Sequence, residues 1–275
     1  FPRLALSVFG FYSLYFTLSA LEGAEKLLLT PTTIAGVLTF FFFLLFLRVS
    51  DEFKDFDSDS ILFPGRPLPS RRVLPKDLKV LGGISVAAML LLNLIFMKAI
   101  WAFLILFGYG LLMLKYFFLR KYISKSLLLA LISHNPSAII LNFYAITIFC
   151  NETGFELFTR KTLFIAVLFW LPGLAWELSR KIKAPEDENQ YETYSIIFGY
   201  KLAAILPVVV MSLHYSMIIF ISGKINLSNY YLAVLTLLLF YYFAMVARFL
   251  IRPNSKTSKL KPYTELFALT SFLGL

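Results

Sequence analysis

The sequence has 275 residues, of which 59% are hydrophobic and only 15% are charged, and its mean hydropathy is +0.76. Soluble domains carry about 25% charged residues, so one soluble core could not bury this much apolar surface. A single cysteine excludes a disulfide framework and a cysteine-ligated metal cluster, and two histidines are too few for a histidine-rich metal site. The composition therefore predicts an all-α polytopic membrane protein in contact with the lipid bilayer.

Nine apolar stretches approach the length of about 20 residues that a helix needs to cross a membrane. They cover residues 4–22, 31–48, 78–98, 100–119, 126–149, 161–177, 200–222, 229–250 and 262–275. We find no internal repeat, low-complexity linker or soluble segment between them. Residues 1–275 are therefore predicted to form a single membrane domain, a bundle of about nine transmembrane helices.

The basic residues predict the orientation of this bundle. When the nine spans alternate in direction, 21 of the 26 lysines and arginines fall on one side. Loops rich in lysine and arginine stay in the cytoplasm, so that side is predicted to be cytoplasmic, with the protein in the inner membrane. The net charge of +10 reflects the same bias and suits anionic headgroups. Because the basic residues are spread over several loops, a nucleic-acid partner is not expected.

One polar stretch, residues 48–73, stands out between two apolar runs. Asp51, Asp55 and Asp59 in it are spaced i, i+4 and i+8, which on a helix places three carboxylates along one face. Like charges at this spacing repel unless a cation lies among them. Oxygen ligands without histidine or cysteine favour Mg²⁺, which takes one or two carboxylates and then phosphate oxygens and water. The alternative is a solvated acidic loop that balances nearby arginines.

The same stretch continues into a proline-rich segment, residues 64–70. Its prolines restrict themselves and their predecessors, so the segment is predicted to be stiff and extended. It would hold Arg66 in a defined place, and arginine suits bidentate contact with phosphate. The alternative is a membrane-surface turn whose arginines reach lipid phosphates.

A second polar segment, residues 176–188, follows the sixth predicted span and lies on the same side of the membrane. Glu177 precedes Arg180 and Lys181 at helical spacing. One interpretation is an ordinary helix salt bridge. The other is a second Mg²⁺ carboxylate, Glu177, with two cations for a diphosphate.

Polar residues inside the spans tend to face the interior of a bundle. Asn93, Asn142 and His214 are of this kind, and we assign His214 to packing because it lies far from the cytoplasmic side. His134 and Asn135 precede Pro136 on the cytoplasmic side of the fifth span. They are candidates for an acceptor pocket, although a hydrogen bond between helices is the competing interpretation.

The two polar segments resemble the signature regions of the UbiA superfamily of intramembrane prenyltransferases. The first family motif, Asn-Asp-x-x-Asp-x-x-x-Asp followed by Pro-x-Arg-Pro-Leu, is matched by Asp51-Glu52-x-x-Asp55-x-x-x-Asp59 and Pro64-Gly65-Arg66-Pro67-Leu68. The opening Asn-Asp is replaced by Asp-Glu, which preserves oxygen ligands. The resemblance implies that Asp51, Glu52, Asp55 and Asp59 bind metal, that Asp51, Asp55 and Asp59 are catalytic, and that Arg66 contacts the diphosphate.

The second family motif, of the Asp-x-x-x-Asp type, is degenerate in this chain. Glu177 corresponds to its first acid and would be catalytic and bind metal. The second acid is Glu186 or Asp187 displaced by an insertion, or Lys181 takes its place; Asp187 is our choice of metal ligand. Arg180 and Lys181 would bind diphosphate. Family members also carry a diphosphate-binding lysine at the end of the fourth span, and Lys115 matches its position.

The resemblance implies Mg²⁺-dependent transfer of an isoprenoid chain from a prenyl diphosphate to an acceptor, with release of pyrophosphate. Cations would stabilise the departing pyrophosphate. A terpene cyclase of the same superfamily would use the same residues, and a transporter is the alternative from another class. Transporters place charges near the midplane or carry repeats, whereas the acids here lie at helix ends. The sequence does not identify the acceptor or the oligomeric state.

Overall fold

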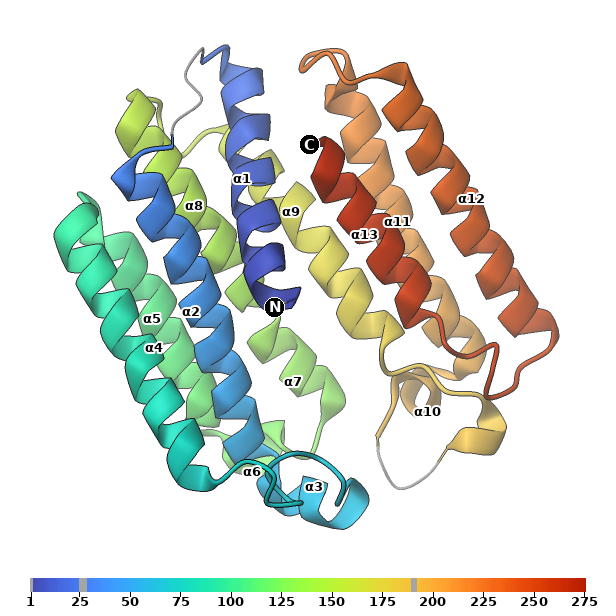
Figure 1. Ribbon diagram of the computed structural model, residues 1–275. Coiled ribbons are helices and arrows are strands. Elements are labelled where there is room, and N and C mark those ends of the chain that lie inside the picture. The colour runs from blue at the N-terminus through green and yellow to red at the C-terminus, as the bar shows by residue number, and fades with distance from the viewer. Residues whose placement is uncertain (1, 25–28, 189–191) are drawn as a thin grey trace.

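The computed structural model describes residues 2–24, 29–188 and 192–275, and these residues form a bundle of long helices (Figure 1). The long helices are α1 Pro2–Glu22, α2 Pro31–Lys54, α4 Pro75–Phe96, α5 Ile100–Leu114, α7 Leu127–His134, α8 Pro136–Thr153, α9 Arg160–Ser179, α11 Tyr200–Ser222, α12 Asn229–Ile251 and α13 Lys261–Gly274. Short helices lie between them, namely α3 Phe56–Leu62, η1 Tyr116–Phe118, α6 Arg120–Ile123, η2 Pro185–Asp187 and α10 Tyr194–Phe198.

Among the described residues, six helices are long and apolar enough to cross a membrane: α2, α4, α7 together with α8, α9, α11 and α12. The shorter α5 is also apolar. The predicted all-helical membrane class is confirmed, while the total of nine spans stays a prediction. The predicted starts at residues 31, 100, 200 and 229 are those of α2, α5, α11 and α12. At α2, Thr30 caps the helix by accepting a hydrogen bond from the Thr33 N–H, and Pro31 occupies the first turn.

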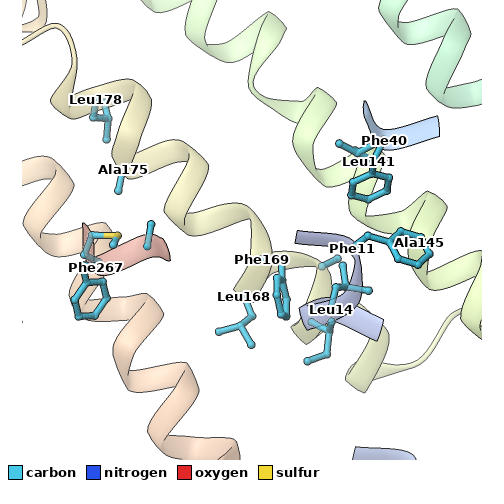
Figure 2. Close-up of a cluster of buried hydrophobic side chains, with 14 of the residues drawn as sticks. Phe11, Leu14, Phe40, Leu141, Ala145, Leu168, Phe169, Ala175, Leu178 and Phe267 are labelled. Atoms are coloured by element: carbon cyan, nitrogen blue, oxygen red, sulfur yellow. The ribbon is translucent and has the colours of Figure 1, made fainter. Parts of the chain in front are cut away.

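The core lies where α1, α2, α8 and α9 meet, with α11 and α13 packed against α9. Phe11 and Leu14 of α1 lie close to Leu168 and Phe169 of α9, as Figure 2 shows. Helix α2 packs on α1, α4 and α8. Gly36 permits this approach, because a Cβ atom there would come within 2.8 Å of the Phe11 ring.

Buried polar groups connect the helices inside the apolar bundle. Pro172 in α9 has no N–H, so the carbonyl of Leu168 one turn earlier lacks its helical partner. His214 of α11 donates its Nδ1–H to that carbonyl at 3.0 Å, and its Nε2 lies 2.9 Å from Ser271 Oγ of α13. His214 is fully buried. The assignment of His214 to packing is therefore confirmed.

A second buried network joins α2, α4 and α8. Asn93 of α4 donates to Thr39 Oγ1 at 2.9 Å and accepts from Tyr144 Oη at 2.8 Å. Separately, Asn142 of α8 donates to the Ala166 carbonyl of α9 at 3.0 Å. The side chains of Asn93 and Asn142 are buried, as polar residues inside a membrane bundle are expected to be.

Two parts of the polar end differ from the sequence expectation. The fifth span is divided at Pro136 into α7 and α8, with Asn135 between them. The proline-rich segment is not extended, because Pro64 occupies the second position of a turn closed by the Arg66 N–H and the Phe63 carbonyl at 2.9 Å. Ser70 N–H then bonds the Arg66 carbonyl at 3.0 Å, so the segment folds back on itself.

Candidate active site

The acidic ladder, Asp51, Asp55 and Asp59, lies at the end of the bundle where α3, α6 and α10 gather (Figure 1). It is not carried by one straight helix. Asp51 lies in the last turn of α2, Asp55 is the residue between α2 and α3, and Asp59 belongs to α3. Helical hydrogen bonds nevertheless run from Asp55 N to Asp51 O at 2.9 Å and from Asp59 N to Asp55 O at 2.8 Å. The one-face spacing therefore continues across a kink at Asp55.

The chain itself supplies cations to most acids of this segment. Lys54 Nζ lies 3.7 Å from Asp51 Oδ1, and Arg66 Nη1 lies 2.5 Å from Asp59 Oδ2. The remaining pairs of the segment are Arg48–Glu52 and Arg120–Asp57. These pairs relieve the repulsion within the ladder that the sequence pattern alone would predict.

Arg66 is held by the folded proline-rich segment. Its guanidinium lies over the Phe63 ring, 4.6 Å from the centroid, while it pairs with Asp59. Asp59 is only 4% exposed. Arg66 is itself more than one-third exposed, so its guanidinium can reach a ligand outside the chain. Arg72 donates to the Gly65 carbonyl and fixes the turn from the other side.

The second polar segment contributes Glu177, Arg180 and Lys181. Glu177 and Arg180 form a bidentate pair, with Nε–Oε2 at 2.6 Å and Nη2–Oε1 at 2.8 Å. Lys181 lies close enough to the ladder to act on it electrostatically. Limited hydration and then Asp59 raise the pKa of Asp55, while Lys54, Arg66 and Lys181 oppose that rise. The fold thus brings Lys181 to Asp55 from a segment more than 120 residues away in the chain.

The other acids around the second segment point to different elements. Ser255, between α12 and α13, donates its Oγ to Asp187 Oδ1 at 2.7 Å and its N–H to Glu186 Oε1 at 3.0 Å. Glu188 accepts from Thr193 Oγ1 at 2.8 Å. Glu192 accepts from the Leu127 N–H at 2.7 Å, at the start of α7. A cleft of about 570 Å³, lined by Arg180, Lys183, Asp187 and Lys259 among others, separates α9 from the α12–α13 connection.

His134 and Asn135, predicted as an acceptor pocket, both have partners within the protein. His134 Nε2 lies 2.8 Å from Lys54 Nζ, and its Nδ1 lies 2.9 Å from Ser133 Oγ. Asn135 Oδ1 accepts from the indole N–H of Trp170 in α9. The contacts with Lys54 of α2 and Trp170 of α9 are the bonds between helices of the competing interpretation, and the acceptor pocket stays a prediction.

Lys54 and Tyr116 were not among the site residues predicted from the sequence. Lys54 contributed only to the count of basic residues that set the orientation, although its position between Asp51 and Asp55 indicated that it would lie at the site. Its Nζ lies 4.4 Å from the Tyr116 ring centroid. Tyr116 follows Lys115, the predicted diphosphate lysine, which is exposed at the end of α5. The left-handed backbone of residues 116–118, which no sequence pattern indicated, places Tyr116 here.

The donor set fits Mg²⁺ in its chemistry. The candidate ligands Asp51, Glu52, Asp55, Asp59, Glu177 and Asp187 are all carboxylates. One buried oxygen, Glu52 Oε2, lacks a hydrogen-bond partner among the described residues, and such an atom can be completed by a cation. In the described ranges, however, His, Cys, Asp and Glu side chains do not converge in groups of three or more. This is compatible with Mg²⁺, which binds through one or two carboxylates when phosphate supplies the other oxygens.

Comparison with known proteins agrees with the architecture. A solved structure described as "Structural and mechanistic insights into the biosynthesis of Digeranylgeranylglyceryl phosphate synthase in membranes" is similar to this chain, with a TM-score of 0.60 and 17% sequence identity. The similarity covers 99% of this chain and 94% of the other. The search of curated proteins found no match. The sequence model of the UbiA prenyltransferase family matches residues 10–271. With its helical bundle and its two facing charged segments, the chain belongs to the UbiA prenyltransferase family.

Proposed function

We propose that this protein transfers an isoprenoid chain from a prenyl diphosphate to an acceptor, with Mg²⁺ as cofactor and pyrophosphate as the second product. The reaction would take place at the cytoplasmic end of the bundle. The observation that carries the proposal is that the two polar segments lie within electrostatic range of each other at one end of the bundle: Lys181 acts on Asp55, and Arg180 acts on Asp51. A metal–diphosphate complex needs carboxylates for the metal and cations for the phosphate oxygens.

The ion pairs at this end suggest how such a complex is received. Asp59 is paired with Arg66, and Glu177 with Arg180. When a diphosphate and Mg²⁺ arrive together, the carboxylates can turn to the metal and the guanidinium groups to phosphate oxygens. Each pair is then replaced by two new opposite-charge contacts. We propose that Asp51, Asp55, Asp59 and Glu177 hold the metal and that Arg66, Arg180 and Lys181 bind the diphosphate.

The chain's cations would also act during the reaction. When the bond between the isoprenoid carbon and the diphosphate oxygen breaks, negative charge accumulates on the leaving pyrophosphate. Lys181 and Arg66 lie where they would stabilise that charge. When bound, Mg²⁺ supplies further stabilisation of the same leaving group as a Lewis acid. Lys115 is exposed and could reach the diphosphate from the α5 side.

The proposal is tested by pyrophosphate release from purified protein. We expect release to require Mg²⁺ and a prenyl diphosphate, and to fall about 10³-fold in Asp55→Asn. Asp57→Asn is the matched control, because Asp57 lies two residues away and is 85% exposed beside Arg120. Its activity should change less than about threefold. Release that is independent of Mg²⁺, or equal effects of the two substitutions, would contradict the proposed site.

The acceptor requires a panel of compounds. A glyceryl phosphate belongs in it, because the solved neighbour is named for digeranylgeranylglyceryl phosphate. Aromatic acids and quinol precursors complete the set. The expected result is an acceptor that carries the isoprenoid chain. A cyclic hydrocarbon or alcohol formed without any acceptor would instead identify a cyclase.

A further inference from the structure

Lys54 is a cation at a position that the first family motif leaves open. It is the last residue of α2, between Asp51 and Asp55, where the first motif leaves the residue type open. Its side chain is only 8% exposed. A buried ammonium costs free energy unless it has partners, so its contacts indicate what holds it in the site.

Three electron-rich groups surround the Lys54 ammonium. They are the Asp51 carboxylate at 3.7 Å, the Nε2 atom of His134 at 2.8 Å and the face of the Tyr116 ring at 4.4 Å. Carboxylate and ring face both attract a cation. An ammonium can only donate, so His134 Nε2 must accept through its lone pair.

The neighbours of His134 agree with this arrangement. Ser133 donates its hydroxyl hydrogen to the Leu129 carbonyl at 2.6 Å. Its oxygen can then accept from His134 Nδ1–H at 2.9 Å. The imidazole is therefore neutral, with its hydrogen on Nδ1 and its Nε2 directed at Lys54. The Tyr116 and Phe117 rings pack on the same imidazole, with centroids 6.3 and 6.1 Å away.

The backbone that presents Tyr116 is unusual. Tyr116, Phe117 and Phe118 have φ values of 49°, 51° and 61°, in the left-handed region that non-glycine residues rarely occupy. Each such residue costs roughly 1–2 kcal/mol. Strained backbone of this kind persists where surrounding contacts determine it, and here those contacts are His134, Lys54 and Arg120, whose guanidinium lies 6.0 Å from the Tyr116 centroid.

Lys54 therefore differs from the other three cations that pair with candidate metal ligands. The side chains of Arg48, Arg66 and Arg180 are 39%, 38% and 38% exposed, so each can turn toward a ligand. Lys54 is enclosed by α2, α7 and the turn at residues 116–118. We propose that Lys54 is a fixed counter-cation, which stays beside Asp51, competes with the divalent cation for that carboxylate and keeps metal affinity low until a diphosphate arrives. This inference rests on the proposed function, because it concerns the same metal site.

The direct test is the binding of Mn²⁺ to the full chain in detergent, measured from the electron paramagnetic resonance signal of free Mn²⁺. Lys54→Met removes the charge but keeps the side-chain length. We expect it to bind Mn²⁺ at least about tenfold more tightly than the unsubstituted protein. A tenfold change corresponds to the repulsion in water between a unit charge and a divalent cation about 6 Å apart. Lys54→Arg keeps the charge and should change the affinity less than about threefold.

A matched lysine controls for overall charge. Lys259 is exposed and lines the cleft that Arg180 also lines, so it lies at the same end of the bundle. Lys259→Met should leave Mn²⁺ affinity unchanged. His134→Leu removes the group that orients Lys54 and should give an affinity between those of the unsubstituted protein and Lys54→Met.

Thermal unfolding shows whether Lys54→Met is folded. We expect this variant to unfold at a lower temperature without metal, because the ladder loses a cation, and to regain more stability than the unsubstituted protein when Mn²⁺ is added. Unchanged Mn²⁺ affinity in folded Lys54→Met would overturn the role of Lys54 alone. Absence of Mn²⁺ binding in every variant, both without and with added pyrophosphate, would overturn both this role and the proposed metal site.

Discussion

The two charged segments at the polar end of the bundle use their acids differently. In the first, residues 48–73, three acids pair with cations of the same segment, namely Asp51 with Lys54, Glu52 with Arg48 and Asp59 with Arg66. In the second, Glu177 has a local partner, while Asp187 and Glu186 accept from Ser255 between α12 and α13. The acid just beyond that segment, Glu192, accepts from the first N–H of α7.

This difference assigns the two segments different tasks. The first places carboxylates on consecutive helical turns, and these are the groups that we propose hold the metal. The second connects α9, α10 and the α12–α13 connection, and its Lys181 acts electrostatically on Asp55. We therefore expect Lys181 of the second segment to matter for catalysis. We expect Glu186 and Asp187, the acids that bond to Ser255, to matter for stability.

Within the second segment, the largest expected effect is that of Lys181→Met. Loss of its ammonium removes stabilisation of the leaving pyrophosphate, so we expect kcat/KM to fall about 10²-fold. Lys183→Met is the matched control in the same segment and should cost less than about threefold, since the substitution keeps the backbone N–H that donates to Ser195 Oγ. Equal losses in the two variants would break the comparison, because the segment would then act by its overall charge.

The pH dependence sharpens the same point. Burial lowers the pKa of Lys181, Arg180 lowers it further, and Glu177, Asp55 and Glu192 oppose this shift. Lys181 therefore loses its proton at a lower pH than an ordinary lysine. As pH rises through that lowered pKa, kcat/KM should fall. Lys181→Arg should remove this alkaline decline, because arginine stays protonated; a decline that persists in Lys181→Arg would assign it to another group.

A smaller effect is expected from Glu192→Gln. The Glu192 carboxylate satisfies one of the N–H groups left open at the start of α7 and interacts favourably with the positive end of that helix. The neutral amide keeps the acceptor but loses the charge, so we expect about 1 kcal/mol of destabilisation. Thermal unfolding in detergent measures it. A loss of activity as large as that of Lys181→Met, without a change in stability, would show that Glu192 belongs to the reacting site.

The local parts of this arrangement were predictable from the sequence. The spacing of Asp51, Asp55 and Asp59 is preserved because helical hydrogen bonds depend on neighbours in the chain. The caps of α2 are local in the same sense. The proline-rich segment was predicted as extended, and this was wrong because Pro64 also suits the second position of a turn.

The contacts between segments could not be predicted in this way. Lys54 meets His134 across 80 residues, and Asp187 meets Ser255 across 68. Such pairs depend on how α2, α7 and the α12–α13 connection pack, and on the left-handed turn at residues 116–118. Charge pattern alone indicated that both segments lie at one end of the bundle, without indicating which acid meets which cation.

The smallest expected effect is that of Ser255→Ala, and it tests the acids that bond to Ser255 most directly. The substitution removes hydroxyl hydrogen bonds to Glu186 and Asp187 but keeps the backbone N–H bond to Glu186. These groups are largely exposed, so we expect a loss of about 0.5–1 kcal/mol in unfolding free energy and little change in kcat/KM. If Asp187 is instead a metal ligand that Ser255 restrains, freeing it should tighten Mn²⁺ binding. A tighter Mn²⁺ affinity in Ser255→Ala would therefore move Asp187 from the supporting acids into the metal site, and an unchanged affinity would keep the two segments distinct.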